Sequence, residues 1–168
     1  MRRIDVKEGD GPSRVGIAVS SFNEPITEPM LDAAASTCEK SGVSEIIVLR
    51  VPGALELPLA VQSLVEEGCE AVVALGAVIK GETDHYEYVA EHATRGITDV
   101  ATRTGVPVGN ALLTVREYDH AVERSLPGPG NKGAEAAAAA IEMARKLASL
   151  RGMDQVEGAG LAERGVDS

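Results

Sequence analysis

Short runs of β-branched and other aliphatic residues alternate with longer stretches of helical periodicity along most of this 168-residue chain. The apolar runs lie at residues 14–20, 44–50, 71–79 and 106–114. Each run is nearly continuous, which is typical of strands that are buried on both faces of a sheet. Strands that are joined through helices lie parallel and are connected by right-handed crossovers. The alternation therefore predicts an α/β fold in which helices cover both faces of a parallel sheet.

The stretches between the apolar runs carry residues that begin or end helices. Gly42 follows the first stretch as a C-terminal cap residue would, and Pro58 lies in a first helical turn, where a missing N–H is tolerated. The expected helices lie at residues 24–41, 54–67, 84–104, 117–125 and 131 to about 150. The length and the 44% hydrophobic content suit one core. We therefore expect an N-terminal arm (residues 1–13), one domain (residues 14–150) and a disordered acidic tail (residues 151–168).

The composition excludes several classes of partner. The net charge of −10 argues against binding to nucleic acid or to an anionic membrane, because both need a cationic face. The longest apolar stretches, such as residues 71–79, are too short to span a bilayer, and no apolar segment follows the basic N-terminus as in a secretory signal. Cys38 and Cys69 are isolated thiols without metal-ligand spacing. We therefore expect a cytoplasmic protein without a structural metal.

The segment from Gly76 to His85 joins a strand to a helix through a glycine turn. The backbone N–H groups of residues 81–84 would be free to bind an anion, helped by the helix dipole and by the Thr83 hydroxyl. His85 in the first helical turn could transfer protons beside a bound phosphate. The alternative is an ordinary helix N-terminus with Thr83 or Asp84 as the capping residue. This segment alone leaves both interpretations open.

Other candidate residues also admit two interpretations. Phe22, the only phenylalanine, could stack on a planar heterocycle or cover the core. Glu56, in a first helical turn, could accept hydrogen bonds from a polyol or simply complement the helix dipole. Lys132 begins a helix, where a cation is unfavourable, so we expect it to serve something other than helix stability. Phe22, Glu56 and His85 all follow expected strand ends, and an open α/β sheet binds ligands beyond the carboxyl ends of its strands.

Together these segments resemble the lumazine synthase family from about Arg14 to Leu150. The motifs that carry the resemblance are Phe22-Asn23, residues 51–58 (VPGALELP), residues 76–85 (GAVIKGETDH) with Tyr88-Val89, Thr114 with residues 121–124 (AVER), and residues 130–133 (GNKG). Their common order and spacing make the resemblance specific. It implies a flavodoxin-like three-layer sandwich whose four parallel strands have the order 2-1-3-4.

The resemblance also implies an activity. Members of the family condense 5-amino-6-(D-ribitylamino)uracil with 3,4-dihydroxy-2-butanone 4-phosphate to give 6,7-dimethyl-8-ribityllumazine in riboflavin biosynthesis, without a cofactor or a metal. Phe22 would stack on the pyrimidine, Asn23 and Glu56 would hold the ribityl chain, and the main chain of residues 77–79 would bind the polar edge of the heterocycle. The residues that the resemblance assigns to this part of the site are Phe22, Asn23, Ala54, Leu55, Glu56, Ala77, Val78 and Ile79.

The phosphate would be held at the start of the following helix. The resemblance implies that Gly81, Glu82 and Thr83 cradle it through N–H groups and a hydroxyl, and that Arg124 forms a bidentate ion pair with it. His85 would move protons during imine formation and phosphate elimination. Because the amine is already nucleophilic and phosphate is a good leaving group, we expect positioning of the two substrates to supply most of the acceleration.

The resemblance finally implies an assembly. In a sheet of order 2-1-3-4, the second and fourth strands lie about 14 Å apart, so one subunit cannot easily gather residues from both ends of the sheet. Sites in the family lie between neighbours in a ring of five, and some members build an icosahedral shell of sixty subunits. We therefore expect a homopentamer at least, in which Asn110, Arg124 and Lys132 serve the neighbour's site. Many members carry an aromatic residue where this chain has Asn110.

Two alternatives to this function remain. The archaeal type of riboflavin synthase shares the fold and starts from the lumazine product, but the intact motifs at residues 81–85 and 131–133 argue against it. A non-catalytic flavin- or lumazine-binding shell protein would keep the pocket and could lose His85 and Arg124, which this chain retains.

Overall fold

The computed structural model describes residues 1, 3–6, 9 and 11–162, and its centre is a sheet of four parallel strands. The strands are β1 (Arg14–Ser20), β2 (Glu45–Val51), β3 (Ala71–Ile79) and β4 (Val108–Val115). Their order across the sheet is β2-β1-β3-β4, and all neighbours pair in parallel. This confirms the predicted strand order, and it makes β2 and β4 the edge strands of the described chain.

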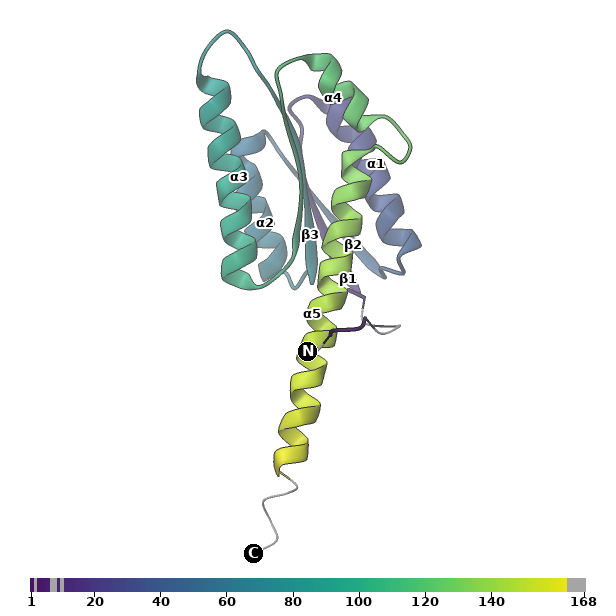
Figure 1. Ribbon diagram of the computed structural model, residues 1–168. Helices are drawn as coiled ribbons and strands as arrows, with labels where there is room; N and C mark the ends of the chain where they lie inside the picture. Colours follow the sequence, from purple (N-terminus) through teal and green to yellow (C-terminus); the bar gives the residue numbers. More distant parts are fainter. Residues whose placement is uncertain (2, 7–8, 10, 163–168) are drawn as a thin grey trace, which may run out of the picture.

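Helices form the two outer layers of the molecule. They are α1 (Glu24–Lys40), the 3-10 turn η1 (Ala54–Glu56), α2 (Leu57–Glu66), α3 (His85–Thr104), α4 (Tyr118–Ser125) and α5 (Lys132–Ala162). Figure 1 shows α2 and α3 on one face of the sheet and α1, α4 and α5 on the other. The fold is therefore the predicted flavodoxin-like three-layer sandwich. None of the described helices is long and apolar enough to cross a membrane.

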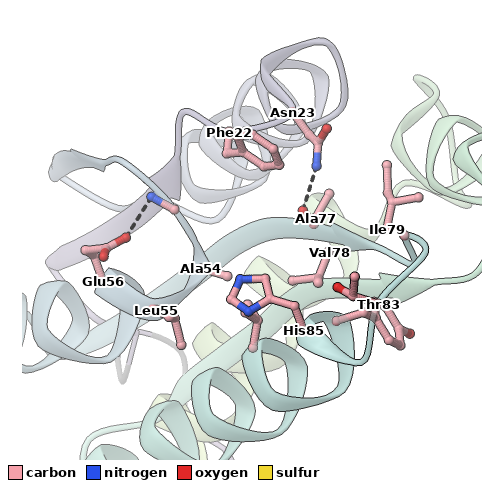
Figure 2. A pocket seen from close by; sticks show the side chains of 14 residues that line it. Phe22, Asn23, Ala54, Leu55, Glu56, Ala77, Val78, Ile79, Thr83 and His85 are labelled. Carbon is pink, nitrogen blue, oxygen red and sulfur yellow. Dashed lines mark hydrogen bonds between the residues drawn. The ribbon is translucent and has the colours of Figure 1, made fainter.

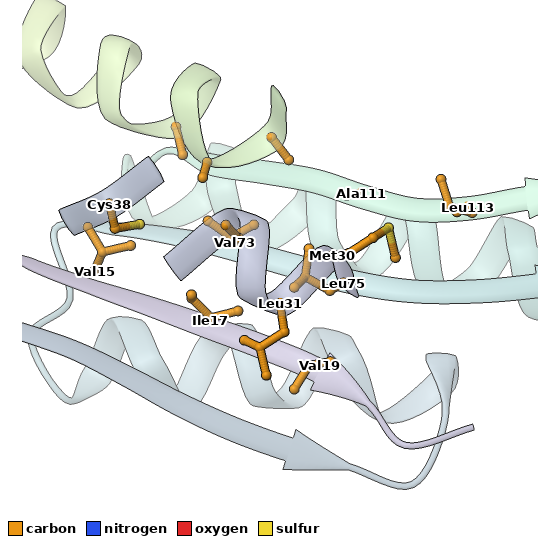
Figure 3. Packing of buried hydrophobic residues seen from close by; sticks show 14 of the residues in the cluster. Val15, Ile17, Val19, Met30, Leu31, Cys38, Val73, Leu75, Ala111 and Leu113 are labelled. Carbon is orange, nitrogen blue, oxygen red and sulfur yellow. The ribbon is translucent and has the colours of Figure 1, made fainter. Parts of the chain in front are cut away.

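Two apolar clusters, one on each face of the sheet, hold the layers together. Val15, Ile17 and Val19 of β1 pack among residues of α1 and α5 (Figure 3). Ala18 of β1 and Val72 of β3 pack among residues of α2 and α3 on the other face. Because successive side chains of a strand point to opposite faces, a single strand contributes to both clusters. The core is thus built from aliphatic side chains and leaves the strand ends free for the polar residues that follow them.

Two glycines let α5 pack directly on the backbone of its neighbours. A Cβ atom on Gly133 would lie 2.1 Å from the Met30 carbonyl oxygen, and one on Gly109 would lie 2.0 Å from the Ala136 carbonyl oxygen. No side chain fits at such distances, so α5 approaches α1 and β4 only because both positions carry glycine. The contact at Gly133 fixes the first turn of α5, which also carries Lys132.

The structure corrects several details of the sequence prediction. The burial of β2 alternates between half-buried and exposed residues, so the expected burial on both faces is wrong for this edge strand. The second predicted helix opens with the 3-10 turn η1, and the α-helix itself begins at Leu57. β4 begins at Val108 and not at Val106, because Pro107 has no N–H with which to extend the ladder.

The largest difference lies near the C-terminal end of the chain. α5 continues to Ala162, whereas the sequence predicts that the helix ends near Leu150 and that a disordered tail follows. Each residue added to an existing helix gains a hydrogen bond, so Gly152 weakens the helix without ending it. Figure 1 shows this last part of α5 running beyond the sheet. The rest of the predicted tail, residues 163–168, lies outside the described residues.

Candidate active site

A cavity of about 390 Å³ lies at the carboxyl ends of β1, β2 and β3 and beside the start of α3. This is the place where an open parallel sheet binds ligands. Figure 2 shows the labelled side chains converging from these segments. Most of the residues that the sequence assigns to the site line this one cavity: Phe22, Asn23, Ala54, Leu55, Glu56, Ala77, Val78, Ile79, Gly81, Thr83 and His85.

Phe22 lies at the mouth of the cavity and not in the core. Its side chain is 70% exposed, although it is the only phenylalanine in the chain. An exposed aromatic ring at the edge of a cavity offers a flat apolar face to a planar ligand. Of the two interpretations left open by the sequence, core covering is therefore wrong.

Asn23 connects the end of β1 with the end of β3. Its backbone is left-handed, with φ 62°, a conformation in which asparagine is tolerated better than most residues. Its Nδ2 donates a hydrogen bond of 2.9 Å to the Ala77 carbonyl oxygen (Figure 2). That bond leaves the Oδ1 of the amide as an acceptor beside the cavity. It also means that the Ala77 carbonyl, which the sequence assigns to the heterocycle, already has a partner.

Glu56 is the last residue of η1 and opens α2. One carboxylate oxygen, Oε2, accepts a hydrogen bond of 2.9 Å from the Gly53 N–H (Figure 2). This contact holds the carboxylate near the cavity while the side chain remains exposed. The remaining lone pairs can accept hydrogen bonds from hydroxyl groups. Glu56 thus orders the turn after β2 and keeps free acceptor positions beside the cavity.

The other end of the cavity is suited to an anion. Gly81, Thr83 and His85 line it at the point where α3 begins. Within the described structure the capping residue Asp84 makes no side-chain hydrogen bond to the helix, although its carbonyl oxygen accepts one from the Glu87 N–H at 3.0 Å. The Asp84 side chain therefore does not block an anion from the start of α3. Glu82 is exposed and is not among the lining residues, which agrees with a carboxylate that points away from an anion.

Three lining residues were not singled out from the sequence as site residues. They are Gly53, Tyr86 and Val89. Val89 lies four positions after His85 and three after Tyr86 on α3, so the helical repeat places Val89 on the same side of the helix as each of them. This spacing from His85 could have identified Val89 as a lining residue from the sequence alone. The half-buried Tyr86 adds a phenol ring to the wall of the cavity.

The remaining predicted site residues lie elsewhere on the molecule. Asn110, Arg124 and Lys132 line a second hollow, also of about 390 Å³, along the edge strand β4 and the start of α5. None of the three lines the cavity that contains His85. The structure therefore divides the predicted site into a cavity half and an edge half within one chain.

Asn110 has a fixed orientation in the edge half. The Leu112 N–H donates a hydrogen bond of 2.9 Å to the Asn110 Oδ1, so a backbone donor determines which end of the amide is the oxygen. The exposed NH₂ group remains available as a donor. The Asn110 oxygen thus satisfies the Leu112 N–H on the strand, and the two N–H donors of its amide face whatever covers the hollow.

The two cations of the edge half are held by local partners. The Arg124 Nη1 donates to the His120 carbonyl oxygen of its own helix at 2.9 Å, and the Lys132 Nζ lies 2.6 Å from the Glu135 Oε2. Such exposed contacts stabilise little and can rearrange when an anion arrives. Both side chains therefore can turn toward a phosphate at the same edge of the sheet.

The cysteines lie away from both halves. Cys38 and Cys69 are free and buried, and burial raises the pKa of the Cys38 thiol to about 11. Neither lines the cavity or the edge hollow. In the part of the chain that the structure describes, no group of three or more His, Cys, Asp or Glu residues could hold a metal ion.

Comparison with known proteins identifies the family. The family model described as 6,7-dimethyl-8-ribityllumazine synthase matches residues 12–148. A protein of that name from Halorhodospira halophila is 44% identical over 141 residues, which cover 82% of this chain and 90% of the relative. Another from Paraburkholderia phymatum is 43% identical over 150 residues, which cover 88% of this chain and 84% of the relative. The chain therefore belongs to the 6,7-dimethyl-8-ribityllumazine synthase family.

Proposed function

We propose that this chain condenses 5-amino-6-(D-ribitylamino)uracil with 3,4-dihydroxy-2-butanone 4-phosphate to form 6,7-dimethyl-8-ribityllumazine, with release of phosphate and water. The observation that carries the proposal is the cavity itself, which joins an aromatic and polyol-binding end to an anion-binding end beside a histidine. Family membership supports the same reaction, since both relatives are named for it. The reaction needs neither a metal nor an organic cofactor.

The pyrimidine substrate occupies the Phe22 end of the cavity in this proposal. The exposed Phe22 ring stacks on the heterocycle, and such a pair contributes about 0.5–1.5 kcal/mol beyond the area that it buries. The Asn23 Oδ1 and the Glu56 carboxylate accept hydrogen bonds from ribityl hydroxyls. Backbone groups of residues 77–79 bind the polar edge of the pyrimidine ring. The small Ala54 side chain leaves room for the ribityl group.

The butanone phosphate occupies the end near α3. Its phosphate accepts hydrogen bonds from the N–H groups of residues 81–84 and from the Thr83 hydroxyl, with help from the helix dipole. This places the ketone carbon next to the amino group of the pyrimidine. A carbon–nitrogen bond forms, a first water leaves to give the imine, and phosphate is then eliminated. The ribityl-bearing nitrogen of the pyrimidine attacks the remaining carbonyl carbon, and loss of a second water closes the ring.

His85 serves as the proton-transfer group in this scheme. It takes the proton that the amine loses on attack and returns one to the departing hydroxyl. Because positioning supplies most of the acceleration, we expect the loss of His85 to lower kcat by about 10- to 1000-fold and not to abolish turnover.

We further propose that a second copy of the chain completes the site. The cavity half lacks a cationic side chain among its lining residues, whereas the edge half carries Arg124 and Lys132 on an open strand edge. Bringing the edge half of one chain to the cavity half of the next is a head-to-tail contact, which gives a ring when the rotation between neighbours closes. We propose a homopentameric, cytoplasmic enzyme.

In the completed site, Arg124 forms an ion pair with the phosphate, and Lys132 adds a second positive charge near it. The oriented Asn110 amide donates toward the heterocycle where many relatives place an aromatic ring. Hence one chain supplies the pyrimidine subsite, and its neighbour supplies much of the charge that balances the phosphate.

A turnover assay with purified protein tests the proposed function. With both substrates we expect the absorbance and fluorescence of the lumazine to appear together with one equivalent of phosphate. No product from both substrates would contradict the proposal and favour a non-catalytic binding protein. Riboflavin formed from the lumazine alone would instead identify the archaeal type of riboflavin synthase.

A further inference from the structure

Asn131 is a buried side chain whose amide contacts three different parts of the chain. It is 0% exposed, and it lies between the end of α4 and the start of α5. Its Nδ2 lies 2.8 Å from the Ser125 carbonyl oxygen and 3.3 Å from those of Leu126 and Pro29. Its Oδ1 accepts hydrogen bonds from the N–H groups of Gly133 and Ala134 at 2.9 and 3.2 Å.

These contacts lie next to the two cations of the edge half. Ser125 directly follows Arg124 at the end of α4, and Gly133 directly follows Lys132 in the first turn of α5. One amide therefore joins the backbone beside Arg124 to the backbone beside Lys132. The bond to Pro29 also ties both of them to α1.

We propose that Asn131 is a positioning residue, which sets the separation of Arg124 and Lys132 and so prepares the edge half for a phosphate group. The inference rests on the proposed function, because it takes the phosphate of the butanone substrate as the ligand of these cations. Asn131 itself is buried behind them and touches no substrate.

Only an amide of this length performs both tasks at this position. The oxygen caps the first turn of α5, and the nitrogen donates to carbonyl oxygens at the end of α4. A serine would retain the cap, because its hydroxyl reaches the same N–H groups, but it would be too short to reach the α4 carbonyls. An alanine would lose both contacts and leave buried polar groups unpaired.

This difference between serine and alanine separates positioning from simple helix capping. If Asn131 matters only for the stability of this junction, Asn131→Ser lowers the thermal midpoint, because the α4 carbonyl oxygens lose their donor, but leaves KM for both substrates unchanged. If it positions the cations, Asn131→Ser in addition loses affinity for the phosphate substrate. A matched control is Ile141→Val, which weakens the packing of the same helix without altering either contact of Asn131.

The experiment measures KM for each substrate, kcat and the thermal midpoint of wild type, Asn131→Ser, Asn131→Ala and Ile141→Val. We expect Asn131→Ser to raise KM for the butanone phosphate about tenfold, while KM for the pyrimidine changes less than about twofold. Ile141→Val lowers the thermal midpoint and leaves both KM values unchanged. Equal shifts of both KM values in Asn131→Ser, or no shift in either, would overturn the proposal.

Titration with inorganic phosphate gives a second readout, which does not depend on turnover. We expect phosphate to bind Asn131→Ser about tenfold more weakly than wild type. Equal affinity of both proteins for phosphate would overturn the positioning role, even if the wild type were inactive. An inactive wild type that still binds phosphate more tightly than Asn131→Ser would count against the proposed reaction alone.

Discussion

Asn23 and Ala77 join two neighbouring strand ends through a hydrogen bond of 2.9 Å from the Asn23 Nδ2 to the Ala77 carbonyl oxygen. The bond holds the turn after β1 against the end of β3 and keeps the Asn23 Oδ1 at the cavity. It also fixes the residue that follows Phe22, whose ring lies exposed at the cavity mouth. The pyrimidine end of the proposed site is therefore ordered before any ligand arrives, which lowers the entropic cost of binding.

Replacement of Asn23 should selectively weaken binding of the substrate that carries the ribityl group. Asn23→Gly keeps the left-handed backbone without strain and removes the acceptor, so we expect KM for the pyrimidine to rise about 10- to 100-fold. KM for the butanone phosphate should change little. Steady-state kinetics with each substrate varied in turn measures both values. A pyrimidine without the ribityl chain that binds wild type as tightly as the natural one would remove Asn23 from this role.

Replacement of Arg124 should produce the opposite selectivity. Arg124→Ala removes a charge-assisted pair with the phosphate, which typically stabilises by about 1.5–3 kcal/mol, so KM for the butanone phosphate should rise at least about tenfold. KM for the pyrimidine should stay near the wild-type value. Arg95→Ala, an exposed arginine of α3 paired with Glu91, is the matched control and should leave both values unchanged. Equal effects of Arg124→Ala on both substrates would exclude Arg124 from the phosphate subsite.

Gly133 should be intolerant of any side chain. A Cβ there would lie 2.1 Å from the Met30 carbonyl oxygen, so Gly133→Ala must separate α5 from α1, and we expect a loss of about 3 kcal/mol or more in the free energy of unfolding. Gly130→Ala is the control, because no atom lies within 4 Å of a Cβ at that position. Urea unfolding at one fixed protein concentration measures the free energy of unfolding of both variants and of wild type. Equal stability of Gly133→Ala and wild type would mean that α5 and α1 are not so closely packed.

Cys38 should be chemically inert in the folded protein. Burial raises the pKa of its thiol to about 11, so the reactive thiolate is scarce at neutral pH and increases only as the pH approaches that value. With Cys69 replaced by alanine, we expect alkylation of Cys38 by iodoacetamide at pH 8 to be at least about 100-fold slower in the native than in the denatured protein. Mass spectrometry follows the modification. Similar rates in the two states would place the thiol at the surface.

The arrangement of the sheet could be predicted from the sequence because the signals were local and strong. Runs such as residues 71–79 indicate buried parallel strands, and the resemblance to a family supplied the strand order. The partial exposure of β2 was not apparent from its residues, since an edge strand of an α/β sheet can be as apolar as a central one. The length of α5 was underestimated because the Gly-rich, acidic segment after Leu150 shows no helical periodicity, although the helix continues to Ala162.

The site was less predictable than the fold. The residues of the cavity half follow strand ends, so the sequence and the resemblance together identify them. The importance of Asn131 could not be inferred from its own segment, because its partners at Ser125 and Pro29 come from α4 and α1. The interaction of Asn23 with Ala77 was missed for the same reason. Contacts between elements that are distant in sequence can be identified only once the tertiary structure is known.

Each active site should form from the cavity half of one chain and the edge half of its neighbour, and co-assembly of two inactive variants tests this arrangement. One variant is Glu56→Ala,His85→Ala and the other is Arg124→Ala,Lys132→Ala; each is assayed alone and after joint refolding, with native mass spectrometry to verify mixed rings. In an equal mixture about one interface in four would combine two intact halves, so we expect recovery of up to about a quarter of wild-type activity. Mixed rings that form but remain as inactive as the separate variants would contradict it.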